Sequence, residues 1–168
     1  MNPGANVSAD VREKKDTIAD LIRDLHNPAI KRRRAAAQHL GRTADPSVIP
    51  HLVEALSDTH PMVRSDIVQA LGRLGDSSAL EALISSLEDK DPLVRAATIA
   101  ALGRIKDRNA VDALIRCLRD KEITIRIGAA EVLGSLKDRR ATGPLKTLLD
   151  DPFSQVREAA EIAIRHIR

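Results

Sequence analysis

Apolar residues in this chain recur at helical spacing, in short stripes separated by turn-forming residues. A spacing of three and four residues places a stripe on one face of an α-helix, so each stripe predicts an amphipathic helix. No segment combines alternation of period two with β-branched or aromatic enrichment, and we therefore predict no β-sheet. Residues 76–106 show two stripes, at Ala79, Leu80, Leu83, Ile84 and Leu87 and at Val94, Thr98, Ala101, Leu102 and Ile105.

Cap residues mark where the two helices of this stretch begin. Asp76 is a favourable N-cap, and Asp91 precedes Pro92 at a first helical position, where a missing N–H costs nothing. The same signals along the chain predict ten helices, at 10–25, 28–43, 46–57, 61–74, 77–88, 92–105, 108–119, 123–136, 139–150 and 153–167.

A single spacing of 31 residues runs through the chain. It relates Gly41, Gly72, Gly103 and Gly134, and likewise Leu40, Leu71, Leu102 and Leu133. Counted back from the last residue, it defines five units, 14–44, 45–75, 76–106, 107–137 and 138–168. We expect one repeat domain over residues 14–168, preceded by an extension at 1–13 that runs into the first helix.

Each unit is a helix pair that cannot bury its apolar stripes alone, so neighbouring units must stack. The predicted fold class is therefore all-α, an α-solenoid of five helix pairs. Glycine in a last helical turn costs about 1 kcal/mol relative to alanine. Because glycine nevertheless recurs at this position, we expect it to allow a close approach to the next helix or a tight turn, rather than to bind phosphate. Polar Arg32, Glu161 and Arg165 replace apolar or glycine positions in the end units, and we interpret them as caps of a complete array.

Composition is that of a folded domain, with 43% hydrophobic and 30% charged residues. Phe153 is the only aromatic residue, so Leu, Ile, Val and Ala must fill the core. Cys117 is the only cysteine, which excludes an internal disulfide. We find neither a secretory signal nor an apolar run long enough to span a membrane, and expect a soluble, cytoplasmic protein.

Three segments carry a resemblance to a known family. DPLVR at 91–95, ALGRI at 101–105 and NAVDALI at 109–115 resemble HEAT repeats, in particular the short type named after phycobilin lyases. The resemblance covers residues 14–168. It implies an α-solenoid whose second helices line a concave side, and a structural role for the repeated Asp and Arg.

The repeated arginine follows an acid by six residues, as Arg95 follows Asp89. A carboxylate at one helix end and a guanidinium in the next first turn can pair within a unit or between units. A line of arginines could instead bind anions, but the accompanying acids favour internal pairing. This ladder consists of Arg33, Arg64, Arg95, Arg126 and Arg157 with Asp58, Asp89, Asp120 and Asp151, and Asn27 takes the first acid position.

Candidate chemistry is sparse. Some enzymes of the same superfamily, the deoxyhypusine hydroxylases, bind iron through His-Glu pairs, but none of the five histidines here precedes a glutamate. His51 and Glu54, three residues apart on one predicted helix, are typical of surface neighbours. Cys117 has no periodic histidine partner and is interpreted as a plain free thiol. We predict no catalytic residue, no metal site and no cofactor.

Net charge is +3 and unevenly spread, because residues 1–44 carry +4 and residues 45–168 carry −1. The run KRRR at 31–34 is a candidate nucleic-acid patch. The absence of nearby aromatic residues for base stacking disfavours that interpretation, and phosphate-only binding stays open.

Helical spacing also predicts which positions of the second helices face away from the core. In the second unit these are Met62, Ser65, Asp66, Gln69 and Arg73, and the other units contribute the residues at 31-residue steps from them. The resulting surface is basic at its N-terminal end, apolar in the middle and acidic toward its C-terminal end. The predicted partner-binding residues are Lys31, Arg34, Met62, Gln69, Arg73, Leu93, Ala96, Ala100, Arg104, Ile127 and Glu131.

This surface includes an exposed apolar strip, formed by Leu93, Ala96, Ala97, Ala100 and Ile127. Such a strip favours a binding partner. Alternatively, the small alanines allow the second helices to pack closely and so keep the curvature of the solenoid tight. The leading hypothesis is a non-catalytic scaffold that holds an acidic or helical segment of another protein in a concave groove. One alternative is a bilin lyase-like accessory subunit that handles a tetrapyrrole and its acceptor protein. A second alternative is nucleic-acid binding through the basic N-terminal end.

Overall fold

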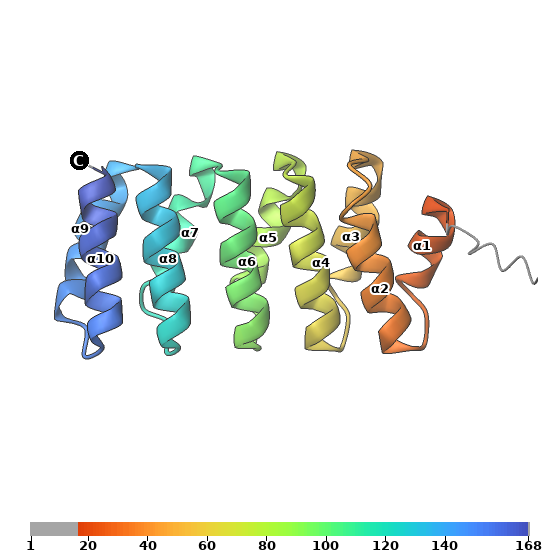
Figure 1. Cartoon of the computed structure of the whole chain (residues 1–168), viewed down its shortest axis with the longest axis horizontal. Coiled ribbons are helices and arrows are strands. Elements are labelled where there is room, and N and C mark those ends of the chain that lie inside the picture. Colours follow the sequence, from red (N-terminus) through yellow and green to blue (C-terminus); the bar gives the residue numbers. More distant parts are fainter. Residues whose placement is uncertain (1–16, 168) are drawn as a thin grey trace, which may run out of the picture.

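The computed structural model describes residues 17–167, which form ten α-helices in a row of helix pairs (Figure 1). The first helices are α1 Ile18–Asp24, α3 Ile49–Ala55, α5 Leu80–Ser86, α7 Val111–Cys117 and α9 Thr142–Thr147. The second helices are α2 Ile30–Leu40, α4 Pro61–Leu74, α6 Pro92–Ile105, α8 Ile123–Leu136 and α10 Ser154–Ile167. Residues 17–167 contain no β-strand. The extension at 1–13 lies outside the described residues, and the division into extension and single domain stays a prediction.

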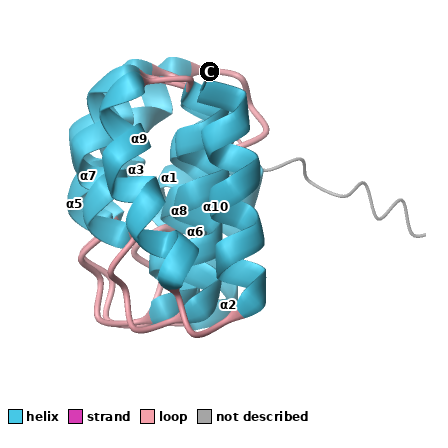
Figure 2. Ribbon diagram, turned by 90° about the vertical axis from the view of Figure 1, so that its left-hand side faces the viewer, coloured by secondary structure: helices cyan, strands magenta, loops and turns pink. Residues whose placement is uncertain are grey.

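Two layers of helices make up the row, with the first helices in one layer and the second helices in the other (Figure 2). Within the second layer, α4 packs between α2 and α6, and α8 packs between α6 and α10. The first and last pairs lie at opposite ends of the row (Figure 1). The prediction of an all-α solenoid is therefore confirmed.

Helix boundaries follow the predicted caps closely. The ranges 61–74, 92–105 and 123–136 coincide with α4, α6 and α8 at both ends. Asp91 accepts a hydrogen bond of 2.9 Å from the N–H of Leu93, and Asp76 accepts one of 2.8 Å from that of Ser78. A single 3₁₀ turn precedes each of α3, α5, α7 and α9, and another follows α9: η1 Pro46–Val48, η2 Ser77–Ala79, η3 Arg108–Ala110, η4 Arg139–Ala141 and η5 Leu148–Asp150.

The predicted start of the first helix at residue 10 lies outside the described residues, and within them Thr17 interrupts the predicted range 10–25. Thr17 has extended backbone angles and its hydroxyl oxygen accepts a hydrogen bond of 3.2 Å from the N–H of Asp20. The Asp20 carboxylate in turn accepts one of 3.3 Å from the N–H of Thr17. This reciprocal capping box satisfies two N–H groups that a continuing helix would have bonded internally, so α1 begins at Ile18.

The repeated glycines let the second helices approach one another closely. A Cβ added at Gly72 would lie 2.6 Å from the Cβ and 2.8 Å from the Cα of Ala101 in the next unit. Gly41 and Gly134 meet Ala70 and Ala163 in the same way. The close-approach explanation of the glycine period is confirmed. Beside these contacts the repeated leucines Leu40, Leu71, Leu102 and Leu133 are fully buried.

Candidate functional site

The exposed side of the second helices, here called the second-helix face, carries the predicted partner-binding residues. Seven of them are exposed: Lys31, Met62, Arg73, Leu93, Ala100, Arg104 and Glu131. The other four are half-buried: Arg34, Gln69, Ala96 and Ile127. All therefore present at least part of their side chain to solvent.

Three neighbouring positions that were expected to face outward are buried. Ser65, Asp66 and Ala159 belong to the interior. Asp66 is covered from the preceding unit, since Arg34 Nε donates to its carboxylate at 2.6 Å and Gln38 Nε2 donates at 3.1 Å. Helical periodicity within one unit does not predict the burial of Asp66, because the covering side chains come from the neighbouring helix.

The same contact changes the charge expected at the N-terminal end of the face. Arg34 is paired with Asp66, and Arg33 with Asp58 at 2.6 Å. The exposed Arg32 lies 3.8 Å from the half-buried Asp24. Two of the four cations in the basic run are thus held in tight internal ion pairs, which weakens the nucleic-acid interpretation of that run.

Met62 and Arg73 lie on one face but at opposite ends of α4. Eleven residues at about 1.5 Å each separate them by about 16 Å along the axis, so the two side chains do not lie side by side. Because the second helices run parallel (Figure 1), one edge of the face carries Met62 and Leu93, which are 40% and 49% exposed. The opposite edge carries Arg42, Arg73 and Arg104, the arginine row.

The arginine row has no internal partner among residues 17–167. None of its guanidiniums forms an ion pair or hydrogen bond there. All three side chains are exposed. Between the two edges in the third unit lie the small residues Ala96 and Ala100. This side of the molecule therefore combines regularly spaced free positive charge with exposed aliphatic surface.

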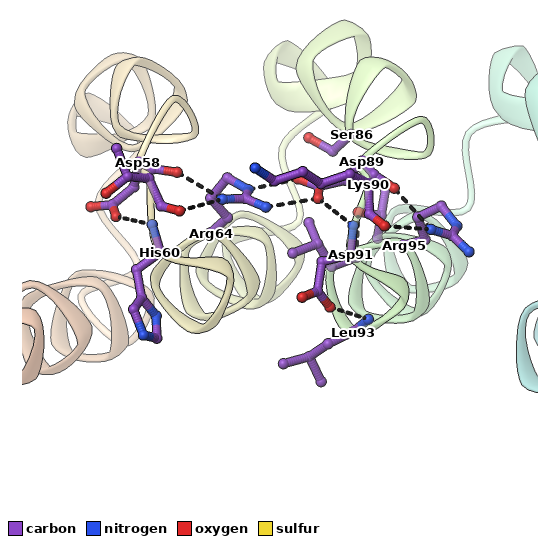
Figure 3. Close-up of polar contacts among 12 residues, drawn as sticks. Asp58, His60, Arg64, Ser86, Asp89, Lys90, Asp91, Leu93 and Arg95 are labelled. Atoms are coloured by element: carbon purple, nitrogen blue, oxygen red, sulfur yellow. Dashed lines mark hydrogen bonds and ion pairs between the residues drawn. The ribbon is translucent and has the colours of Figure 1, made fainter.

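Four of the five ladder arginines behave differently, because Arg33, Arg64, Arg95 and Arg126 each bond to the next unit, as Arg64 does in Figure 3. Arg64 donates from Nε and NH2 to the Asp89 carboxylate at 2.6 and 2.8 Å. Its NH1 donates to the backbone carbonyls of Asp58 and Thr59 at 2.8 and 3.2 Å. The acid six residues before the arginine thus accepts a hydrogen bond through its backbone carbonyl. The carboxylate of the same acid accepts hydrogen bonds from the arginine of the preceding unit. Arg33, Arg95 and Arg126 repeat the arrangement.

Electrostatics at the ladder favour the charged forms. Burial alone would raise the pKa of the Asp89 carboxyl, but hydrogen bonds from Arg64 and from the N–H of Asp91 outweigh it, so the pKa lies below its usual range. Arg157, in the last unit, keeps the NH1 bonds to the carbonyls of Asp151 and Pro152. No carboxylate among residues 17–167 pairs with it.

Other candidate chemistry stays apart. His51 and Glu54 are exposed on α3, and residues 17–167 hold no cluster of three or more potential metal ligands. Burial raises the pKa of the Cys117 thiol to about 11. Within the same part of the chain, none of the helices combines the length and apolar character that crossing a bilayer requires.

Comparison with known families and structures gives a consistent picture. The family model described as HEAT repeats matches residues 16–92 and 80–165. No curated protein matches the sequence. Among solved structures, the complex of CpcE and CpcF of phycocyanin lyase from a Nostoc species is similar with a TM-score of 0.78 at 26% identity, over 98% of this chain and 70% of that one.

Designed repeat proteins share the fold. A designed armadillo repeat protein in complex with the peptide (KR)4 is similar with a TM-score of 0.69 at 16% identity, over 90% of this chain and 82% of that one. A computationally designed armadillo repeat protein for modular peptide recognition is similar with a TM-score of 0.66 at 20% identity, with the same coverage of 90% and 82%. At these identities the likeness concerns the fold alone.

Proposed function

We propose that this chain, which belongs to the HEAT-repeat family, is a cytoplasmic, non-catalytic scaffold that binds a segment of another protein along its second-helix face. The arginine row carries the proposal. Exposed arginines without internal partners recur at one-repeat steps on the same face as the exposed Met62 and Leu93. Arginine flanked by aliphatic surface is a typical hot-spot composition of protein interfaces, and here it stands in for absent Trp and Tyr.

Spacing within the row fits an acidic segment. Packed helices lie about 8–10 Å apart, so consecutive guanidiniums recur on about that scale. Three residues of an extended polyproline-type segment advance about 9 Å, and two turns of an α-helix advance about 11 Å. Carboxylates at either interval would meet Arg42, Arg73 and Arg104 in turn. The partner we propose is accordingly an acidic segment, extended or helical.

The fold is one that holds peptides, as the designed armadillo repeat protein does with (KR)4. Charge complementarity here requires the opposite sign, because the row consists of arginines. The row, rather than the internally paired Arg33 and Arg34, would steer an acidic partner toward the face. Met62 and Leu93 would exclude water from one edge of the contact.

A purely structural role for Arg73 and Arg104 is the competing explanation. Both lie in the last turns of their helices, where a cation gains about 0.3–1 kcal/mol from the helix dipole. A purely structural role affects the stability of the helices and does not involve a partner. If that role is the only one, reversing both charges leaves partner capture by the folded protein unchanged. If the arginines bind a partner, the same change reduces capture.

The test is affinity capture from native lysate with three baits: wild type, Arg73→Glu with Arg104→Glu, and Arg139→Glu with Lys146→Glu, whose side chains are exposed. The last bait makes the same charge change in the first-helix layer. We expect a partner that the wild type and the control retain and the row variant loses. Titration of that partner should then show an affinity loss of about tenfold or more and a weaker salt dependence. Equal retention by all three folded baits would exclude the second-helix face.

A second candidate function rests on the similarity to the phycocyanin lyase complex. A lyase-like accessory subunit would handle a tetrapyrrole and its acceptor protein. Incubation with a bilin, followed by absorption spectroscopy, tests this role. A saturable absorbance change would favour it, and an unchanged spectrum at high protein concentration would exclude it.

A further inference from the structure

We infer that a hollow between α7 and α9 is a binding site for a small amphipathic anion, meaning an apolar molecule with a carboxylate or sulfonate head. This α7–α9 hollow lies in the first-helix layer, in the opposite layer to the second-helix face. Its lining consists of Ile115, Arg116, Leu118, Arg119, Gly143, Pro144 and Thr147.

The space is of ligand size. The hollow measures about 510 Å³, within the range of about 300–1,000 Å³ that small-molecule pockets occupy. Gly143 lines the hollow, and a Cβ added there would meet no atom within 4 Å, so the position borders open space. Earlier units carry Glu81 and Asp112 at the equivalent position of the first helix. The missing side chain therefore leaves room at the rim.

The lining divides into an apolar part and a cationic part. Leu118 is buried, and Ile115 and Pro144 are half-buried, so aliphatic surface faces the hollow. Arg116 and Arg119 are exposed, and neither forms an ion pair or hydrogen bond within residues 17–167. Their freedom contrasts with the ladder arginines Arg33, Arg64, Arg95 and Arg126, which are held in ion pairs. Two unpaired guanidiniums beside an apolar wall favour an anion with an apolar body.

A related hollow two units earlier shows that this chemistry is not a general property of the repeat. It lies between α3 and α5 and measures about 380 Å³. Val53 and Leu56 take the places of Ile115 and Leu118, but Ser57 takes the place of Arg119. Glu88 and Asp89 also line it, and no arginine does. The Glu88 carboxylate would disfavour an anion there, so of these two hollows the later one has the required charge.

The probe is anilinonaphthalene sulfonate, an amphipathic anion whose fluorescence rises in an apolar site, with dodecanoate as competitor. We expect saturable fluorescence that dodecanoate abolishes and dodecanol does not. Arg116→Gln with Arg119→Gln should weaken probe binding about tenfold or more, since hydrogen bonds to a charged group are lost. Gly143→Leu should weaken it similarly by filling the hollow. Lys106→Gln with Lys137→Gln, a charge control at two exposed lysines outside both proposed sites, should bind the probe within about twofold of wild type.

Several results would overturn the inference. Equal competition by dodecanol would indicate an apolar surface without charge recognition. Unchanged affinity in the Arg116 and Arg119 variant, or in Gly143→Leu, would place the probe elsewhere. An equal loss in the Lys106 and Lys137 control would indicate an effect of net charge. Circular dichroism of every variant at the assay temperature separates loss of the site from loss of the fold.

Discussion

Arg95 and Asp120 lie in successive units, and the guanidinium donates from Nε and NH2 to the two carboxylate oxygens at 2.8 and 2.9 Å. The side chains are 8% and 14% exposed, so water competes little for these bonds. Arg95 also donates from NH1 to the carbonyl of Asp89 at 2.9 Å. One side chain thus closes the inter-helix turn of its own unit and ties that unit to the next.

Replacing Arg95 with alanine should lower the free energy of unfolding by about 1–3 kcal/mol, because a charge-assisted pair is lost and Asp120 is left without its partner. Denaturant melts monitored by circular dichroism measure the change. Arg157→Ala is the matched control. Since Arg157 bonds only to carbonyls within residues 17–167, its loss should be smaller. Equal losses would mean that the carboxylate contact adds nothing.

Adding one methyl group should have opposite effects at two glycines. Gly72→Ala places a Cβ 2.6 Å from that of Ala101, and the overpacking, which typically costs about 1–3 kcal/mol, should outweigh a propensity gain of about 1 kcal/mol. Gly143→Ala meets no atom within 4 Å and should gain up to about 1 kcal/mol. Urea midpoints of the two variants check the sign, and a stabilised Gly72→Ala would refute the close-approach explanation.

Acid should loosen the ladder. Hydrogen bonds from arginine and backbone, outweighing the effect of burial, hold the pKa values of Asp58, Asp89 and Asp120 below the usual range. The resulting stability is present above the unfolded pKa of about 3.9 and is lost as pH falls through the lower folded values. Thermal midpoints should therefore change little from about pH 7 to pH 5 and fall steeply below about pH 4.

A ladder variant provides the internal comparison for that pH profile. Asp120→Asn cannot lose a proton, so its stability near neutrality should be lower and its decline in acid shallower than that of the wild type. Parallel profiles for the two proteins would contradict a contribution of the ladder to acid sensitivity.

Cys117 should be nearly inert in the native protein. Burial, together with the nearby Asp120 carboxylate, raises the pKa of its thiol to about 11, so little thiolate exists near neutral pH. Reaction with a disulfide reagent at about pH 8 should be slow in buffer and fast in denaturant. Rapid reaction of Cys117 in the folded protein would show that the C-terminal end of α7 unfolds readily.

The fold could be predicted from the sequence because its determinants are local and repeated. Asp91 followed by Pro92 defines the start of α6 within a few residues of chain, and His60 followed by Pro61 does the same for α4. The second-helix face was predicted only in part. Periodicity placed Arg73 and Arg104 correctly on the surface, but it also placed Asp66 there, which Arg34 of the neighbouring unit covers.

The sequence by itself determined the repeat length and the helix caps, since both follow from intervals of one unit or less. Only the tertiary structure decided which charges are free. Arg64 pairs with Asp89 rather than with the carboxylate six residues before it, and Arg116 and Arg119 find no partner within residues 17–167. Which acid an arginine pairs with depends on the distances between neighbouring helices. Stacking of the units sets those distances through contacts such as that of Gly72 with Ala101, and a pattern along the chain does not contain them.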